Sequence, residues 1–146
     1  MIRVAVVGAA GYIGGELLRL LLGHPEVDVT GAVSSRFPGK RVDGVHPNLR
    51  SATELTFCAA EEVAECDVVF LALPHRVAMT QIDHWIQRSK LVIDLTGDFR
   101  LDDTEVFQRY YGEEHQAPHL LDDFVPGLPE LHRESLRAAD LISVPG

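Results

Sequence analysis

The chain has 146 residues, 46% of them hydrophobic, with 13 basic and 22 acidic side chains and a formal net charge of −9. This composition is that of an ordinary globular domain and excludes disordered and low-complexity classes. The negative charge argues against nucleic acid or an anionic membrane as a partner. An anionic ligand must therefore be bound by a few local groups and not by the net charge of the protein. Without a long apolar run or a secretion signal, the protein is expected to be cytoplasmic.

The first part of the chain begins with a buried strand and a helix. Residues 2–7 form a short apolar run typical of a strand covered on both faces, and the run ends at Gly8. Apolar residues then recur at helical spacing until Gly23-His24-Pro25 ends the pattern. Strands are also predicted at 27–33, 55–57 and 68–73, with a short helix at 61–65.

The same alternation continues to the end of the chain. Helices are predicted at 77–87, 103–111 and 130–138, and strands at 91–95 and 141–144. Six strands separated mostly by helices predict an α/β fold of the Rossmann type, with a doubly wound, mostly parallel sheet flanked by helices. No repeat or linker divides the chain, so residues 1–146 are interpreted as one nucleotide-binding domain.

A glycine-rich turn joins the first strand to the first helix. The glycines of Gly8-Ala9-Ala10-Gly11-Tyr12-Ile13-Gly14 have the spacing G-x-x-G-x-x-G, a variant of the dinucleotide fingerprint. Such glycines allow a tight turn and a close backbone approach to a pyrophosphate, which the free amides at the helix N-terminus then bind. The predicted contacts to the cofactor are made by Gly8, Ala10, Gly11, Tyr12, Ile13 and Gly14.

The end of the second predicted strand indicates which dinucleotide binds. NAD sites place a carboxylate there for the ribose 2′-hydroxyl. Here the strand is followed by Ser34, Ser35 and Arg36, whose hydroxyls and guanidinium suit a 2′-phosphate. We therefore predict NADP as the cofactor, the alternative being that Arg36 is a solvated loop charge.

Several segments together resemble one enzyme family. They are Gly8–Gly14 and Ser34-Ser35-Arg36, then His46-Pro47-Asn48-Leu49-Arg50, Ala72-Leu73-Pro74-His75, Asp94-Leu95-Thr96-Gly97-Asp98-Phe99-Arg100-Leu101, Arg109-Tyr110-Tyr111-Gly112 and Gly127-Leu128-Pro129-Glu130. The chain is similar over its whole length to the N-terminal domain of N-acetyl-γ-glutamyl-phosphate reductases of arginine biosynthesis, which are relatives of aspartate-semialdehyde dehydrogenase.

The resemblance implies a two-domain, homo-oligomeric reductase that uses NADPH to convert a small acyl phosphate into a semialdehyde with release of phosphate. In that family the nucleophile is a cysteine in a Pro-Gly-Cys motif after the last strand of this domain. The sequence ends at Val144-Pro145-Gly146. We therefore expect a truncated domain without its substrate domain, which binds the cofactor and contains no catalytic residue.

Two further residues follow predicted strands. The resemblance implies that His75 lines the nicotinamide side of the site, and the alternative is a loop histidine bound by backbone. Arg100 is suited to the anionic acyl phosphate, and its alternative is an ion pair with Asp98, Asp102 or Asp103.

Other candidate groups are assigned structural roles. Cys58 is predicted to follow a strand and Cys66 to end a helix, both as small core residues. Trp85, Tyr110 and Tyr111 are interpreted as core aromatics. His115 and His119 lack the pattern of a zinc site, so no metal is predicted.

Three alternatives to this function stay open. A close branch of the same family reduces an aminoadipyl phosphate attached to a carrier protein in lysine biosynthesis, and the stretch 46–50 resembles that branch equally well. The chain could also be a stand-alone NADP-binding module, or belong to a dehydrogenase of the same fold with another substrate.

Overall fold

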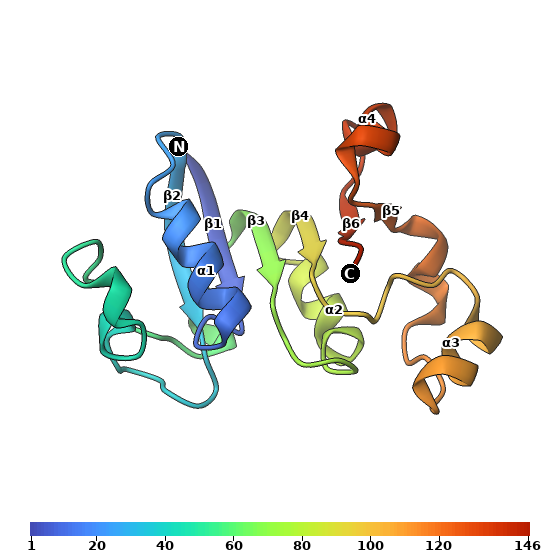
Figure 1. Ribbon diagram of the computed structural model, residues 1–146, viewed down its shortest axis with the longest axis horizontal. Coiled ribbons are helices and arrows are strands. Elements are labelled where there is room, and N and C mark those ends of the chain that lie inside the picture. The colour runs from blue at the N-terminus through green and yellow to red at the C-terminus, as the bar shows by residue number, and fades with distance from the viewer. The chain divides into compact units, whose positions relative to one another are not determined.

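Strands and helices alternate along the chain in the computed structural model, which describes residues Met1–Gly146 (Figure 1). The chain divides into two compact units, Met1–Ala72 and Leu73–Gly146. The predicted α/β alternation is confirmed in both units. No helix is both long enough and apolar enough to cross a membrane.

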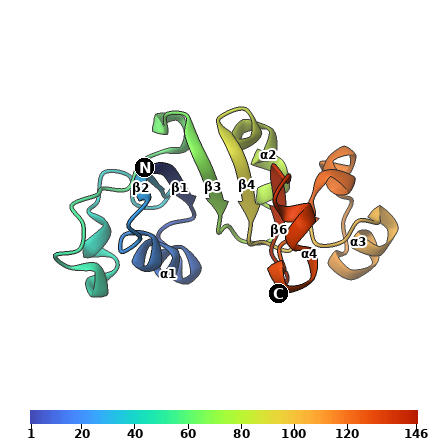
Figure 2. The ribbon, with the colours of Figure 1, turned by 90° about the horizontal axis from the view of Figure 1, so that it is seen from above.

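The first unit is built around strand β1. Its elements are β1 (Ile2–Val7), α1 (Tyr12–Leu21), β2 (Val27–Val33) and β3 (Cys66–Leu71). Strand β1 pairs in parallel with β2 on one side and with β3 on the other, so that Val4 lies opposite both Val29 and Val68. Helix α1 covers one face of β1 and β2 in both ribbon views (Figures 1 and 2).

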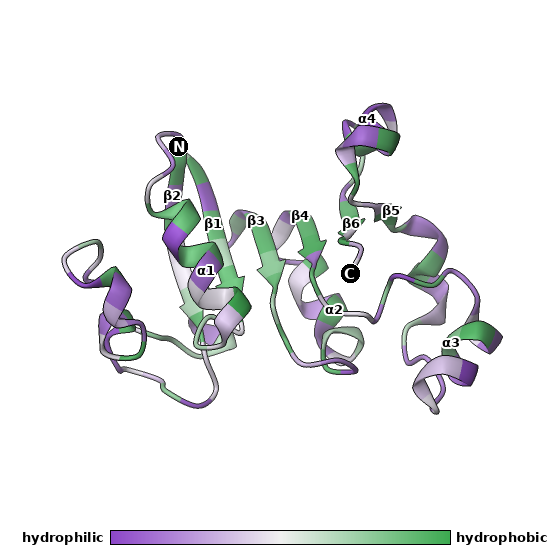
Figure 3. Cartoon of the chain, viewed as in Figure 1, coloured by the Kyte–Doolittle hydropathy of each residue, from purple (hydrophilic) through white to green (hydrophobic).

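The core of this unit explains why β1 has no polar side chain beyond its start. Side chains from β1, β2, α1 and the segment after β2 form one buried cluster, namely Val6, Ala9, Leu18, Val29, Ala32, Val42, Leu49 and Phe57. A parallel strand covered on both faces has a continuous apolar run rather than an alternating one. Figure 3 shows that run, in which the strands are coloured hydrophobic over most of their length.

The second unit contains the remaining strands and helices. They are α2 (Ala78–Ile86), β4 (Ser89–Asp94), α3 (Thr104–Tyr111), β5 (Val125–Pro126), α4 (Pro129–Leu136) and β6 (Leu141–Ser143). Strand β6 pairs in parallel with both β4 and β5. Helix α2 packs on β4 and contributes the fully buried side chain of Trp85, as predicted.

The ends of helix α3 follow from local sequence. Before the helix, the Asp103 carboxylate accepts hydrogen bonds from the backbone amides of Glu105 and Val106, at 2.8 and 3.0 Å. Such a cap satisfies amides that have no partner inside the helix. The helix stops at Gly112, whose φ of +77° is the left-handed conformation that favours glycine.

Two predicted elements and one residue assignment are wrong. Residues 55–57 form no strand, because the backbone of Phe57 bonds instead to Gly39 and Lys40 in a loop that buries its ring. The sixth strand is β5, which is too short for periodicity to reveal. The helix expected at 61–65 is one 3₁₀ turn, Ala60–Glu62, so Cys66 begins β3 and does not end a helix.

Candidate functional site

The glycine-rich turn lies at the carboxyl end of β1. Gly8 has a φ of +81°, and the amides of Gly8 and Ala9 both donate to the carbonyl of Val33 at the end of β2, at 3.1 and 2.9 Å. These bonds bring the turn and the segment that begins at Ser34 together at one edge of the sheet. In parallel α/β sheets, ligands bind at this edge.

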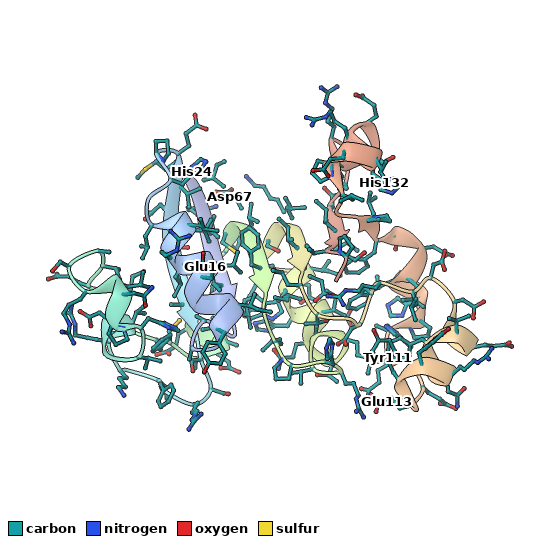
Figure 4. The ribbon with its side chains drawn as sticks, in the orientation of Figure 1. Glu16, His24, Asp67, Tyr111, Glu113 and His132 are labelled. Carbon is teal, nitrogen blue, oxygen red and sulfur yellow. The ribbon has the colours of Figure 1, made fainter.

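The start of α1 has unused hydrogen-bond donors. The backbone amides of Ala10, Tyr12, Ile13 and Gly14 donate to no protein acceptor, whereas the next amide in the helix bonds to the carbonyl of Gly11. No acidic side chain occupies the first turn, and the first carboxylate of α1, Glu16, pairs with Arg19 on the helix surface (Figure 4). The positive end of the helix dipole is therefore free to bind an anion.

Gly14 is required by the packing of this turn. A Cβ atom at that position would overlap the carbonyl oxygen of Gly8 and lie 2.6 Å from the Cα of Ala9. Both neighbours are backbone atoms and cannot rotate away. The helix can begin this close to β1 only without a side chain, which is the role of the third glycine in the fingerprint.

Two cations gather after β2, and only one was predicted. The Arg36 guanidinium and the Lys40 ammonium each lie 5.0 Å from the centre of the Phe37 ring. Ser34 is buried and Ser35 is exposed beside them. Neither cation has an ion-pair partner, whereas Arg41 is paired with Asp43 at 2.8 Å. Lys40 was missed because a basic residue in a loop carries no periodic signal.

In the second unit, the segment after β4 folds around buried carboxylates. Asp94, the last residue of β4, accepts hydrogen bonds from the backbone amide and hydroxyl of Thr96, at 3.1 and 3.0 Å. Burial raises the pKa of Asp94 from 3.8 to about 6, and the hydrogen bonds from Thr96 oppose that rise. The Asp94 carboxyl group therefore holds its proton to a higher pH than an exposed aspartate does.

Asp98 ties the same segment to helix α2. Its two carboxylate oxygens accept from the backbone amides of Arg76 and Met79, at 2.7 and 3.1 Å, and its own carbonyl accepts from Nε2 of the buried His115 at 2.7 Å. No side chain at the N-cap residue of α2 supplies this function. Asp98 thus holds the strand-to-helix connection, in which Arg76 adopts a φ of +73°.

His75 lies in the turn after β3 and is bound by backbone, as the alternative to a nicotinamide contact predicts. Its Nδ1 accepts a hydrogen bond from the Gly97 amide at 3.0 Å, and its ring centre is 6.2 Å from that of Tyr111. A Cβ atom on Gly97 would lie 2.6 Å from the Tyr111 hydroxyl oxygen. Figure 4 shows Tyr111 at the end of α3 next to Glu113, which pairs with Arg76 at 3.3 Å.

Arg100 bonds to backbone carbonyls and not to the nearby aspartates. Its Nε donates to the carbonyl of Val144 at 2.9 Å, and Nη2 donates to that of Leu95 at 3.2 Å. The guanidinium therefore ties together the segments that follow β4 and β6. Its Nη1 faces Gly146, where a Cβ atom would lie 2.7 Å away. The alternative of an ion pair with Asp98, Asp102 or Asp103 is not observed.

The remaining candidates have less reactive surroundings. Burial raises the pKa of the thiols of both Cys58 and Cys66, which disfavours the thiolate form. Tyr110 is 74% exposed, so its assignment to the core is wrong, and Tyr111 is only half-buried. No three His, Cys, Asp or Glu side chains are grouped so that they could hold a metal ion.

Comparison with known proteins identifies a family over nearly the whole chain. Residues 3–139 match the model of the semialdehyde dehydrogenase NAD-binding domain. The chain is 51% identical to a [LysW]-L-2-aminoadipate 6-phosphate reductase of Deinococcus radiodurans, covering 98% of this chain and 41% of the relative. It is also 51% identical to an N-acetyl-gamma-glutamyl-phosphate reductase of Methanopyrus kandleri, covering 100% and 44%. The chain thus spans less than half the length of these relatives.

Solved structures show the same fold at lower identity. An aspartate semialdehyde dehydrogenase of Candida albicans, crystallised with NADP, has a TM-score of 0.68 at 18% identity, over 99% of this chain and 42% of that one. An aspartate semialdehyde dehydrogenase II of Vibrio cholerae has a TM-score of 0.70 at 20% identity, over 99% and 38%. These matches confirm the Rossmann-type α/β class.

Proposed function

We propose that this chain, which belongs to the semialdehyde dehydrogenase NAD-binding domain family, holds NADP(H) for the reduction of an acyl phosphate to a semialdehyde with release of phosphate. The observation that carries the proposal is the row of unpartnered amides at Ala10, Tyr12, Ile13 and Gly14, at the carboxyl end of β1. Bound NADPH supplies the hydride that reduces the acyl group.

The glycine-rich turn fits a pyrophosphate in both chemistry and space. Its free amides are donors for phosphate oxygens, and the missing side chain of Gly14 brings the helix terminus against the strand. Gly8 supplies the left-handed turn, and Gly11 precedes the first helical residue. The nearly fully exposed side chain of Tyr12 projects from the same helix terminus.

The segment after β2 supports NADP rather than NAD. The turn that follows the strand has two serines and the Arg36 guanidinium where an NAD site needs a carboxylate. Lys40 adds a second cation over the same aromatic ring. A 2′-phosphate is a dianion with several acceptor oxygens, and these donors match it better than a ribose hydroxyl.

The resemblance to the family implies roles for two further residues, which follow β3 and β4. Following the resemblance, we propose that His75, whose Nδ1 accepts a hydrogen bond from the Gly97 amide, lines the nicotinamide side of the site. We propose that Arg100 faces the acyl phosphate with Nη1, the part of its guanidinium that the two carbonyls leave free.

We place the nucleophile and the substrate domain outside these 146 residues. The relatives are more than twice as long as the matched region, and both thiols in this chain have a raised pKa. By the same resemblance, we propose that the whole protein is a cytoplasmic homo-oligomer that acts on a small-molecule substrate. This chain is its cofactor-binding domain.

For the acyl group, we propose N-acetyl-γ-glutamyl phosphate, and the equal identity to a carrier-linked aminoadipate phosphate reductase supports a second candidate. The product of the complete gene should be assayed for NADPH oxidation and phosphate release with each acyl phosphate. Turnover of the free N-acetylated substrate alone supports the first candidate, and turnover of the carrier-linked substrate alone supports the second. Turnover of neither, with NADPH bound, would reject both.

A further inference from the structure

His46 contacts the glycine-rich turn from a distant part of the sequence. Its Nε2 lies 2.8 Å from the carbonyl oxygen of Ala9, although the two residues are 37 positions apart. The ring is half-buried, and its centre lies 6.3 Å from that of Phe57 in an edge-to-face arrangement. Its backbone amide donates to the carbonyl of Val42 at 2.9 Å, which fixes the main chain from which the ring projects.

This contact determines how the peptide between Ala9 and Ala10 is oriented. A carbonyl oxygen only accepts hydrogen bonds, so Nε2 of His46 must carry the proton. In a planar trans peptide the carbonyl and the following amide point in opposite directions. Holding the Ala9 carbonyl toward His46 therefore turns the Ala10 amide away from it, and that amide has no acceptor in the protein.

The same ring explains a glycine that the fingerprint does not require. The spacing of the motif accounts for Gly8, Gly11 and Gly14, but the next residue is also glycine. A Cβ atom on Gly15 would overlap Cε1 of His46 and lie 2.6 Å from its Nδ1. The neighbouring Phe57 ring limits how far the imidazole can retreat from a new side chain.

We propose that His46 is a positioning residue, which holds the Ala9–Ala10 peptide so that the Ala10 amide faces the cofactor pyrophosphate, and that Gly15 lacks a side chain in order to admit its ring. This inference rests on the proposed role of the glycine-rich turn. Because NADPH and NADH share the pyrophosphate, both should depend on His46 equally.

The test is a double-mutant cycle in the product of the complete gene, with the Kd of NADPH and of NADH measured by calorimetry. Gly15→Ala should weaken both dinucleotides about tenfold or more, and His46→Ala about five- to twentyfold. In the double variant the new methyl group occupies the vacated space, so its Kd should match that of His46→Ala within about twofold. His46→Gln, whose amide can donate from the position of Nε2, should recover most of the loss.

A second readout does not depend on bound cofactor. The imidazole ¹⁵N shifts of His46 in the free protein should show a proton on Nε2, the nitrogen that faces the Ala9 carbonyl. Additive losses in the cycle, a Gly15→Ala variant that binds like wild type, or a His46→Ala variant with a lower Tm and unchanged Kd values would each overturn the positioning role. Failure of the wild-type protein to bind either dinucleotide would instead overturn the proposed function.

Discussion

Removing the Arg36 guanidinium should lower the affinity for NADPH relative to NADH without abolishing dinucleotide binding. Arg36 follows β2 closely in sequence, and the last residue of that strand, Val33, accepts hydrogen bonds from the turn amides of Gly8 and Ala9. The turn is expected to bind the pyrophosphate, which NADPH and NADH share. The Arg36→Ala variant should therefore lose affinity for NADPH and keep its affinity for NADH.

The size of the loss follows from the surroundings of the two cations. A hydrogen bond to a charged group contributes about 1.5–3 kcal/mol, and solvent and salt reduce this value for an exposed side chain. Arg36 is exposed, so we expect a loss of about 1–3 kcal/mol, or about 5- to 150-fold in the Kd of NADPH. Lys40→Ala should cause a smaller loss, because an ammonium lacks the bidentate geometry of a guanidinium.

Calorimetric titration of each variant with NADPH and NADH measures this change directly. Arg41→Ala is the matched control, since it removes a nearby exposed guanidinium that Asp43 already neutralises. The control should leave the ratio of the two Kd values within about twofold of wild type. Equal losses of both dinucleotides in Arg36→Ala, or an equal effect of Arg41→Ala, would refute the assignment of Arg36 to the 2′-phosphate.

Three other substitutions test the packing and the buried charges. Gly14→Ala should abolish measurable dinucleotide binding in calorimetry because its methyl group meets backbone atoms. Gly23→Ala should bind normally, because its Cβ would lie 3.8 Å from the nearest atom, an ordinary contact. Burial raises the pKa of Asp94 to about 6, so the folded chain binds that proton more tightly than the unfolded chain does. The free energy of unfolding should therefore fall by at most about 3 kcal/mol as the pH rises from about 4 to 6. Urea unfolding at several pH values should show less of this fall in Asp94→Asn and all of it in Asp102→Asn, an exposed control. Asp98→Ala leaves two backbone amides at the start of α2 without an acceptor and should lower the free energy of unfolding by about 1–3 kcal/mol, with unchanged stability as the refuting result.

The fold was predictable where one local pattern decides the structure. The apolar run of β1 and the helical spacing after Gly11 were both recognised, and the observed bounds Ile2–Val7 match the predicted strand. The failures have a different origin. Residues 55–57 are as apolar as a strand, but their backbone partners lie in the loop at Gly39 and Lys40, and that pairing depends on the tertiary fold.

In the candidate site too, the residues that are contiguous in sequence were predicted, and those that only the fold brings together were not. The glycine spacing and the serines with Arg36 are contiguous in sequence, so their chemistry can be inferred from residue types alone. His46 and Lys40 lie in the loop after β2, which has no regular period, and only the fold brings them to Ala9 and to the Phe37 ring. Residue type alone gives the wrong burial for Tyr110, because the aromatic ring that packs inward from α3 belongs to Phe107.

Arg100 illustrates how a residue can be correctly placed and yet incompletely understood. Its position after β4 predicts a cation at the ligand-binding edge, and charge alone suggests an aspartate partner among its neighbours. The structure instead uses two of its donors on carbonyls that follow two different strands. Carbonyls at strand ends lack ladder partners, so a planar guanidinium satisfies both at once and leaves its remaining nitrogen for an anion. The orientation of the Arg100 guanidinium is thus set by the backbone of the segments that follow β4 and β6.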